Sequence, residues 1–199
     1  MKPQEFKNIW TNISKPLSPL TLARLHRFNL SKPTIDFLTI AGLPIHAQPD
    51  LSFAKDIDDT FYGINKLTDQ YHFLNDDPEY EKYIVIGSCR DGDAIAIDTD
   101  TQDQIVQLDH EDGFRPANFN STIETLADFL ILFRDFESEV LKDKKSEESF
   151  QFFNFTNAQF DDLKNKMLIS DSKAVTEKGF WKDELEILLS IRQECFGKK

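Results

Sequence analysis

Acidic side chains are concentrated in one short stretch of the chain. Residues 91–112 contain eight Asp and Glu residues and no Lys or Arg. Within this stretch, Asp98, Asp100 and Asp103 come closest to a cation-binding pattern. A calcium loop needs oxygen ligands at alternate positions, glycine at the sixth position and a bidentate Glu at the twelfth. Counted from Asp98, those two positions hold Asp103 and Asp109. A solvated turn is therefore the better interpretation, and no metal site is predicted.

The run Asp109-His110-Glu111-Asp112 suggests acid–base chemistry, because histidine titrates near neutral pH. Adjacent residues on a strand point to opposite faces of a sheet, so these side chains are not expected to converge on one substrate. Cys89 lies beside Arg90, which could lower the pKa of a thiol. The sequence shows no His and Asn arrangement of a cysteine protease, no phosphate loop and no zinc-protease motif. We therefore expect a binding protein that has no cofactor, and not an enzyme.

The overall charge favours a particular kind of partner. The 199 residues carry a net charge of −12, which would repel the phosphates of nucleic acid. A basic protein is a better partner, because opposite fields accelerate encounter and select between partners. The acidic stretch is explained equally well as a solvated face. The sharper hypothesis is that it docks a cation-rich partner, through Asp91, Asp93, Asp98, Asp100, Asp103, Glu111 and Asp112.

The acidic residues lie on and between three short β-rich runs. Strands are predicted near 82–88, 93–98 and 104–109, separated by turns that contain the Gly and Asp residues typical of hairpins. In the second strand, alanine alternates with isoleucine, which indicates that both faces are covered. A long helix is expected to follow, capped by Ser121 with Glu124 three residues further on.

Helices and short strands are expected on both sides of this meander. Helical spacing of apolar residues predicts an N-terminal helix over 3–13 and two C-terminal helices near 157–168 and 176–195. Ser31 is expected to cap a further helix that stops at Gly42. Short strands are predicted at Leu51-Ser52-Phe53 and Phe61-Tyr62-Gly63-Ile64, and Trp10 and Trp181 are expected in the core.

The predicted fold class is α+β, with a mostly antiparallel (mixed) sheet that contains a central three-stranded meander and is flanked by N- and C-terminal helices. One domain is expected over residues 1–199, with a helical extension at 1–19. Residues 143–156 are predicted to form a charged linker and a Phe-rich insertion. The residues from Phe150 to Phe155 would form either a strand or an exposed patch that contacts a partner.

Several short motifs follow one another along the chain: Pro33–Pro44, Ile86-Gly87-Ser88, Gly92-Asp93, Ala96-Ile97-Asp98, Asp109-His110-Glu111, Thr125–Leu130 and Gly179–Leu185. In this order they resemble the motifs of the SUKH superfamily, which includes a yeast cell-wall synthesis regulator and bacterial immunity proteins. The first, a proline-initiated helix ending in Gly-Leu-Pro, and the last, a closing Phe-Trp helix, resemble the immunity branch. The resemblance covers most of residues 20–190.

The resemblance implies a function. Members of the immunity branch protect a producing cell from its own secreted toxin, and these toxins are often nucleases or deaminases with cationic sites. We therefore expect an immunity protein that binds and neutralises a cognate, basic toxin domain by protein–protein contact. Two alternatives stay open at this point. One is a regulatory adaptor with an endogenous partner, and the other is a small hydrolase that uses the carboxylates of Asp91–Asp103 with a metal.

The sequence also predicts where the protein acts. Its first residues lack the apolar core of a secretory signal, and no run approaches the ~18 apolar residues of a membrane span. Cys89 and Cys195 are too few for a disulfide framework. These features predict a cytoplasmic protein with no membrane partner, whose oligomeric state is left open.

Overall fold

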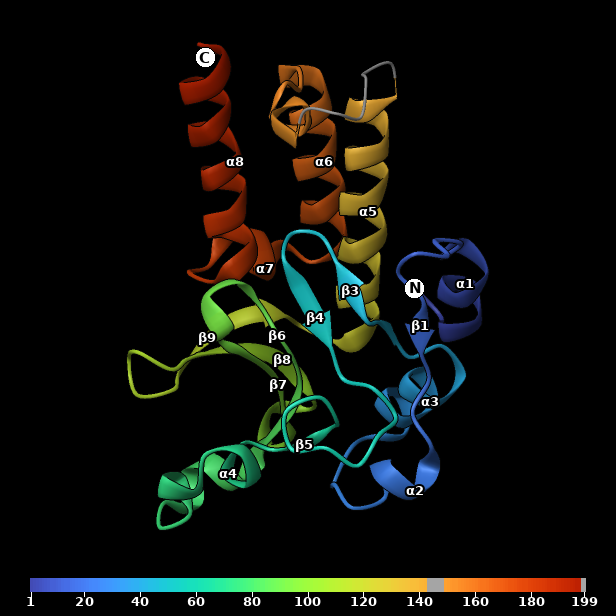
Figure 1. The fold of residues 1–199 in the computed structure, drawn as a ribbon, viewed down its shortest axis with the longest axis vertical. Coiled ribbons are helices and arrows are strands. Elements are labelled where there is room, and N and C mark those ends of the chain that lie inside the picture. Colours follow the sequence, from blue (N-terminus) through green and yellow to red (C-terminus); the bar gives the residue numbers. More distant parts are fainter. Residues whose placement is uncertain (143–148, 198–199) are drawn as a thin grey trace.

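The computed structural model describes residues 1–142 and 149–197, without the side chains of Asp91, Ser149 and Phe150 (Figure 1). The helices are α1 (Pro3–Ile9), α2 (Leu22–Leu25), α3 (Lys32–Ile40), α4 (Leu67–Gln70), α5 (Ile123–Leu141), α6 (Asn157–Ser170), α7 (Ser172–Thr176) and α8 (Phe180–Phe196). The strands are β1 (Leu17–Ser18), β2 (Leu43–Pro44), β3 (His46–Ala47), β4 (Leu51–Phe53), β5 (Asn65–Lys66), β6 (Tyr83–Ser88), β7 (Ala94–Asp98), β8 (Gln104–Asp109) and β9 (Arg115–Asn120). The 3₁₀ helices are η1 (His72–Leu74), η2 (Pro78–Lys82), η3 (Arg90–Gly92), η4 (Thr99–Thr101) and η5 (Ser149–Phe153). The predicted α+β class is confirmed.

A seven-stranded antiparallel sheet forms the centre of the protein. Its strand order is β3-β4-β6-β7-β8-β9, and β5 pairs with β6 beside this path. The predicted meander is confirmed as β6, β7 and β8. The sequence reasoning missed the fourth strand of the meander, β9, because Pro116 and two Asn residues give it little β propensity. Its position at the edge of the sheet tolerates the proline.

Both faces of the sheet are covered, as the alternation of Ala and Ile in β7 indicated. Ile95 and Ile97 belong to the main core, which also contains the apolar residues of α5. Ala94 and Ala96 belong to a smaller core on the other face, formed with residues of α4, η1 and the β8–β9 turn. In Figure 1, α5, α6 and α8 rise on one side of the sheet, whereas α4 lies at its lower end.

The long helix α5 begins one residue later than predicted. Thr122 is its N-cap: the Thr122 hydroxyl accepts from the N–H of Thr125, and the Thr125 hydroxyl accepts from the N–H of Thr122, both at 3.2 Å. Ser121 is not the cap, because its N–H and hydroxyl donate to Asp171 at 2.6 and 2.9 Å. The expected cap was therefore wrong by one residue.

The N-terminal helix is shorter than predicted, since α1 ends at Ile9 and Ile13 is 95% exposed. Phe6 and Trp10 are nevertheless buried against α3 and α5, and Trp181 is fully buried. The expectation that both Trp residues lie in the core is confirmed. Gly42 follows α3 with φ +67°, as expected of a residue that ends a helix.

The predicted strand at Phe61-Tyr62-Gly63-Ile64 is wrong. The carboxylate of Asp59 accepts hydrogen bonds from the N–H groups of Phe61 and Tyr62, at 2.9 and 2.8 Å. These bonds close a turn, because an Asp side chain can take the place of a backbone partner. The strand β5 begins one residue after the predicted segment, at Asn65.

The Phe-rich segment forms a 3₁₀ helix, η5, so of its two predicted alternatives the strand is wrong. Phe155 is fully buried and stacks on Phe160 with ring centroids 5.7 Å apart. Phe152 and Phe153 are half-buried and pack against the main core. Residues 143–148 of the predicted linker, and the side chain of Phe150, lie outside the described residues. In the described part of the chain, no helix is both long and apolar enough to cross a membrane.

Candidate partner-binding surface

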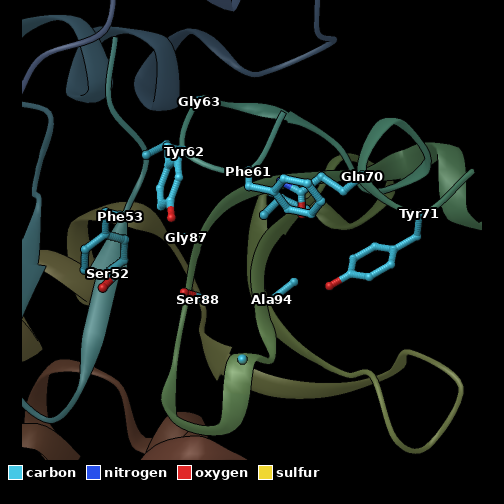
Figure 2. Close-up of a pocket in the computed structure, with 13 residues that line it drawn as sticks. Ser52, Phe53, Phe61, Tyr62, Gly63, Gln70, Tyr71, Gly87, Ser88 and Ala94 are labelled. Atoms are coloured by element: carbon cyan, nitrogen blue, oxygen red, sulfur yellow. The ribbon is translucent and has the colours of Figure 1, made fainter. Parts of the chain in front are cut away.

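An open pocket of about 370 Å³ lies over the sheet where β4, β6 and β7 meet (Figure 2). We call it the sheet pocket. Small residues form its floor on β6 and β7, namely Gly87, Ser88 and Ala94. Tyr62 and Tyr71 stand over this floor from two different segments, and Figure 2 shows both hydroxyl groups directed toward it.

Gly87, one of the residues that line the pocket, allows β4 to lie close to β6. Gly87 pairs with Phe53 of β4 and, after a bulge, with Ile95 of β7. A Cβ atom at Gly87 would lie 2.3 Å from the carbonyl oxygen of Ser52, which no side chain tolerates. This close approach explains in physical terms why the Ile-Gly-Ser run of β6 contains a glycine.

Exposed aromatic side chains lie in the pocket lining and beside it. Phe61, Tyr62 and Phe73 are 67%, 64% and 74% exposed, and they are the exposed large aromatic residues of the described chain. Tyr71 lines the pocket, and its ring centroid lies 6.0 Å from that of Phe73 and 4.6 Å from that of Phe114. We call Phe61, Tyr62, Tyr71 and Phe73 the aromatic rim. Aromatic residues are enriched at protein–protein interfaces.

Carboxylates lie on two sides of the aromatic rim. The side chain of Asp58 is 93% exposed, three residues before Phe61. The N–H groups of Tyr62 and Phe61 lower the pKa of Asp59, which therefore stays ionised at neutral pH. Glu111 and Asp112 are exposed in the turn that leads to Phe114, the ring on which Tyr71 packs.

Three of the seven acids proposed as a docking surface are buried and hydrogen-bonded. Asp93 accepts from Gln107 at 2.7 Å and from the N–H of His110 at 3.1 Å. Asp98 accepts from the N–H of Asp100 in the turn that follows it, and Asp103 accepts from the N–H of Ser31 at 2.7 Å. These carboxylates stabilise the hairpins and the start of α3, and they are buried in the protein.

The exposed acids divide between two ends of the meander. Asp100 lies in the β7–β8 turn, whereas Glu111 and Asp112 lie in the β8–β9 turn at the other end of β8. The backbone of Asp91 lies in η3, before β7, and its side chain is outside the described part. The structure therefore does not bring the seven acids onto one surface. The pair next to the aromatic rim is Glu111 and Asp112.

The sequence argument that the acids around His110 would not converge was incomplete. Strand β8 ends at Asp109, and the chain then turns, so ligand atoms of Asp93, Asp109 and His110 lie within 4.8 Å of one another. Asp109 already accepts from the N–H groups of Glu111 and Asp112, at 2.9 and 3.1 Å. The hydrogen bond to Asp93 raises the pKa of His110. These hydrogen bonds explain why the three side chains lie together: they stabilise the start of the β8–β9 turn.

The pairing of Arg90 with Cys89 does not form a reactive site of the kind considered from sequence. The guanidinium of Arg90 pairs with Glu184 of α8, and Cys89 is buried. Burial raises the pKa of Glu184, and the charge of Arg90 opposes that shift. The pair attaches the β6–β7 hairpin to the C-terminal helix.

Sequence reasoning missed the sheet pocket because Phe61 and Tyr62 were assigned to a strand. A usable signal was present, since the three acids Asp56, Asp58 and Asp59 precede these aromatic residues without the alternation of a half-buried strand. No local signal places Tyr71 over Ala94, because that proximity depends on how α4 packs on the sheet.

The chain is similar to a known protein family. The SUKH-4 immunity protein family matches residues 20–187, which is most of the chain. No curated protein and no solved structure matches it. The resemblance drawn from Ile86-Gly87-Ser88 and the other motifs is confirmed, and the chain belongs to the SUKH-4 immunity protein family.

Proposed function

We propose that this protein protects its cell by binding a cognate bacterial toxin domain and blocking it through stoichiometric protein–protein contact. The observation that carries the proposal is the family match over residues 20–187, which supports an immunity function. We further propose that it acts in the cytoplasm and without catalysis. A nuclease or deaminase is the toxin class that fits best, because an acidic protein can cover a site that binds phosphates.

Charge supports this choice of target. The net charge of −12 favours encounter with a basic domain, and the attraction should weaken with salt. Of the seven acids proposed from sequence, the structure exposes Asp100, Glu111 and Asp112. The buried acids Asp93 and Asp98 support this proposal indirectly, because they stabilise the turns that carry the exposed ones.

The experiment uses the full chain and the toxin domain encoded by the adjacent gene. Binding is measured by calorimetry at about 50 and 300 mM salt, together with rescue of cells that express the toxin. We expect 1:1 binding, rescue, and weaker affinity at the higher salt concentration. Absence of binding and rescue would overturn the proposal. Binding to an endogenous cell-wall or signalling protein instead would favour a regulatory adaptor.

Charge reversal then locates the acidic contact. Glu111→Lys and Asp100→Lys change exposed residues at opposite ends of β8, so they make a matched pair. We expect Glu111→Lys to weaken binding by about tenfold, through lost attraction and added repulsion, and Asp100→Lys to have little effect. Equal affinities for both variants and the wild type would remove the acids of the meander from the interface.

A further inference from the structure

We infer that the aromatic rim and the sheet pocket anchor the partner, and that the occupant is a basic loop of the toxin domain with an Arg or Lys side chain seated in the pocket. This inference rests on the proposed function and assigns its binding site. It moves the centre of the contact from the acidic turns to a surface that those turns flank.

The first argument is the distribution of exposed aromatic residues. All three of those in the described chain belong to the rim, at Phe61, Tyr62 and Phe73. Phe61 and Tyr62, in the turn after β4, line the pocket, and Phe73 of η1 lies beside Tyr71, which also lines it. A few anchor residues, often aromatic, usually carry most of the binding energy of an interface, and truncating them weakens binding most. Clustering around a concavity is the arrangement that such anchors require.

The second argument is the chemistry of the pocket. The residues that line it are uncharged: Val85 and Ala94 are apolar, whereas Gln70 and Ser88 offer hydrogen-bonding groups. An Arg or Lys side chain matches this lining, because its stem is apolar and its head can bond to neutral acceptors. The faces of Tyr62 and Tyr71 can also receive a cation. The ammonium group of Lys55 lies 5.5 Å from the centroid of the Tyr62 ring, so a cation of the partner would use the other face of Tyr62 or the ring of Tyr71.

The third argument is the charge around the rim. Asp58 and Asp59 precede Phe61 in its turn, and Glu111 and Asp112 lie in the turn that leads to Phe114. Asp58 and Asp112 pair with Arg24 and Arg115 at 3.6 and 3.0 Å, so Asp59 and Glu111 are the carboxylates of this set outside those pairs. Aromatic side chains can also stack on the bases of single-stranded nucleic acid. Here the carboxylates would repel the phosphates, and the net charge of −12 adds to that repulsion. The same charge disfavours a second copy of this chain as the occupant.

The test replaces exposed rim residues and a matched residue elsewhere. The rim variant is Phe61→Ser with Tyr62→Ser, and the control is Ile169→Ser, at an 87% exposed apolar residue of α6. Exposed side chains contribute little to folding, so all variants should keep the thermal midpoint of the wild type. Binding to the adjacent-gene toxin domain is measured by calorimetry. We expect the rim variant to bind at least about thirtyfold more weakly and the control to bind within about twofold of the wild type.

A pocket variant tests the seated side chain separately. Gln70→Trp places a large ring at the edge of the pocket, from the half-buried last residue of α4. We expect it to weaken binding as strongly as the rim variant does while leaving the midpoint unchanged. If the wild type binds and both the rim variant and the pocket variant bind with the same affinity as the wild type, the inference is overturned but the proposed function stays intact. Failure of the wild type to bind would overturn the proposed function itself. Loss of binding in the rim variant, with no dependence on salt in the wild type, would overturn the basic occupant.

Discussion

Oδ1 of Asp93 lies 2.7 Å from Nδ1 of His110, across the start of β7 and the end of β8. The same carboxylate oxygen accepts from the N–H of His110, and the other oxygen, Oδ2, accepts from the side chain of Gln107. This one buried side chain therefore fixes the beginning of the β8–β9 turn, which carries Glu111 and Asp112. The relationship connects a buried acid with two exposed acids.

The first prediction concerns pH. The hydrogen bond and charge of Asp93 raise the pKa of His110 in the folded state above its usual 6.5. The resulting stabilisation is fully present below about pH 6.5 and is lost as the pH rises through the higher, folded-state pKa. His110→Gln should therefore reduce the free energy of unfolding more at pH 5.5 than at pH 9, in urea titrations. His72→Gln, at an exposed histidine outside this pair, is the control. An equal loss at both pH values would contradict the assignment.

The second prediction concerns the ion pair between Arg90 and Glu184. Arg90→Leu leaves a buried carboxylate without its cation, which should cost about 3 kcal/mol in the free energy of unfolding. Burial already raises the pKa of Glu184, so protonation relieves that cost. The loss should be smaller at pH 5 and grow as the pH rises through the folded-state pKa. Adding Glu184→Leu to Arg90→Leu should recover part of it. A double variant less stable than Arg90→Leu alone would show that the pair is not the cause.

The third prediction concerns Asp171, which joins two helix starts. Its carboxylate accepts from Ser121 and Thr125 near the start of α5 and from the N–H of Ala174 in α7. Asp171→Ala should lower the free energy of unfolding by about 2 to 3 kcal/mol, because hydrogen bonds to a buried charge are lost together. Asp162→Ala, at an exposed pair with Lys166, should cost no more than about 0.5 kcal/mol. Similar costs for both variants would argue against this role.

The fourth prediction concerns Gly87 at the floor of the sheet pocket. Gly87→Ala forces β4 away from β6, because the new Cβ would meet the carbonyl of Ser52 at 2.3 Å. We expect a loss of about 3 kcal/mol or an unfolded chain, measured by chemical denaturation. Gly113→Ala has no atom within 4 Å of its Cβ and only the strain of a positive φ. That control should cost about 1 kcal/mol. A milder effect at Gly87 than at Gly113 would show that β4 moves freely.

The sequence predicted the elements whose signals are local. Alternating residues placed β6, β7 and β8, helical spacing placed α5, α6 and α8, and Ile86-Gly87-Ser88 pointed to the correct superfamily. The misassigned segments are those where local propensity is weak or overridden. Strand β9 forms because β8 pairs with it, and the turn at Phe61 forms because Asp59 replaces a backbone partner.

The sequence by itself determined the charge of the protein, the order of its central strands and its family. Only the tertiary structure decided which acids face solvent. Asp93 is buried where it bonds to β8 and to the turn that follows β8. Asp103 is buried where it bonds to Ser31, 72 positions away. The same holds for the aromatic rim, since Tyr62 and Tyr71 line one pocket only because their segments pack on one sheet. Residue type and spacing carry no record of such contacts, because burial depends on partners that are distant in the chain.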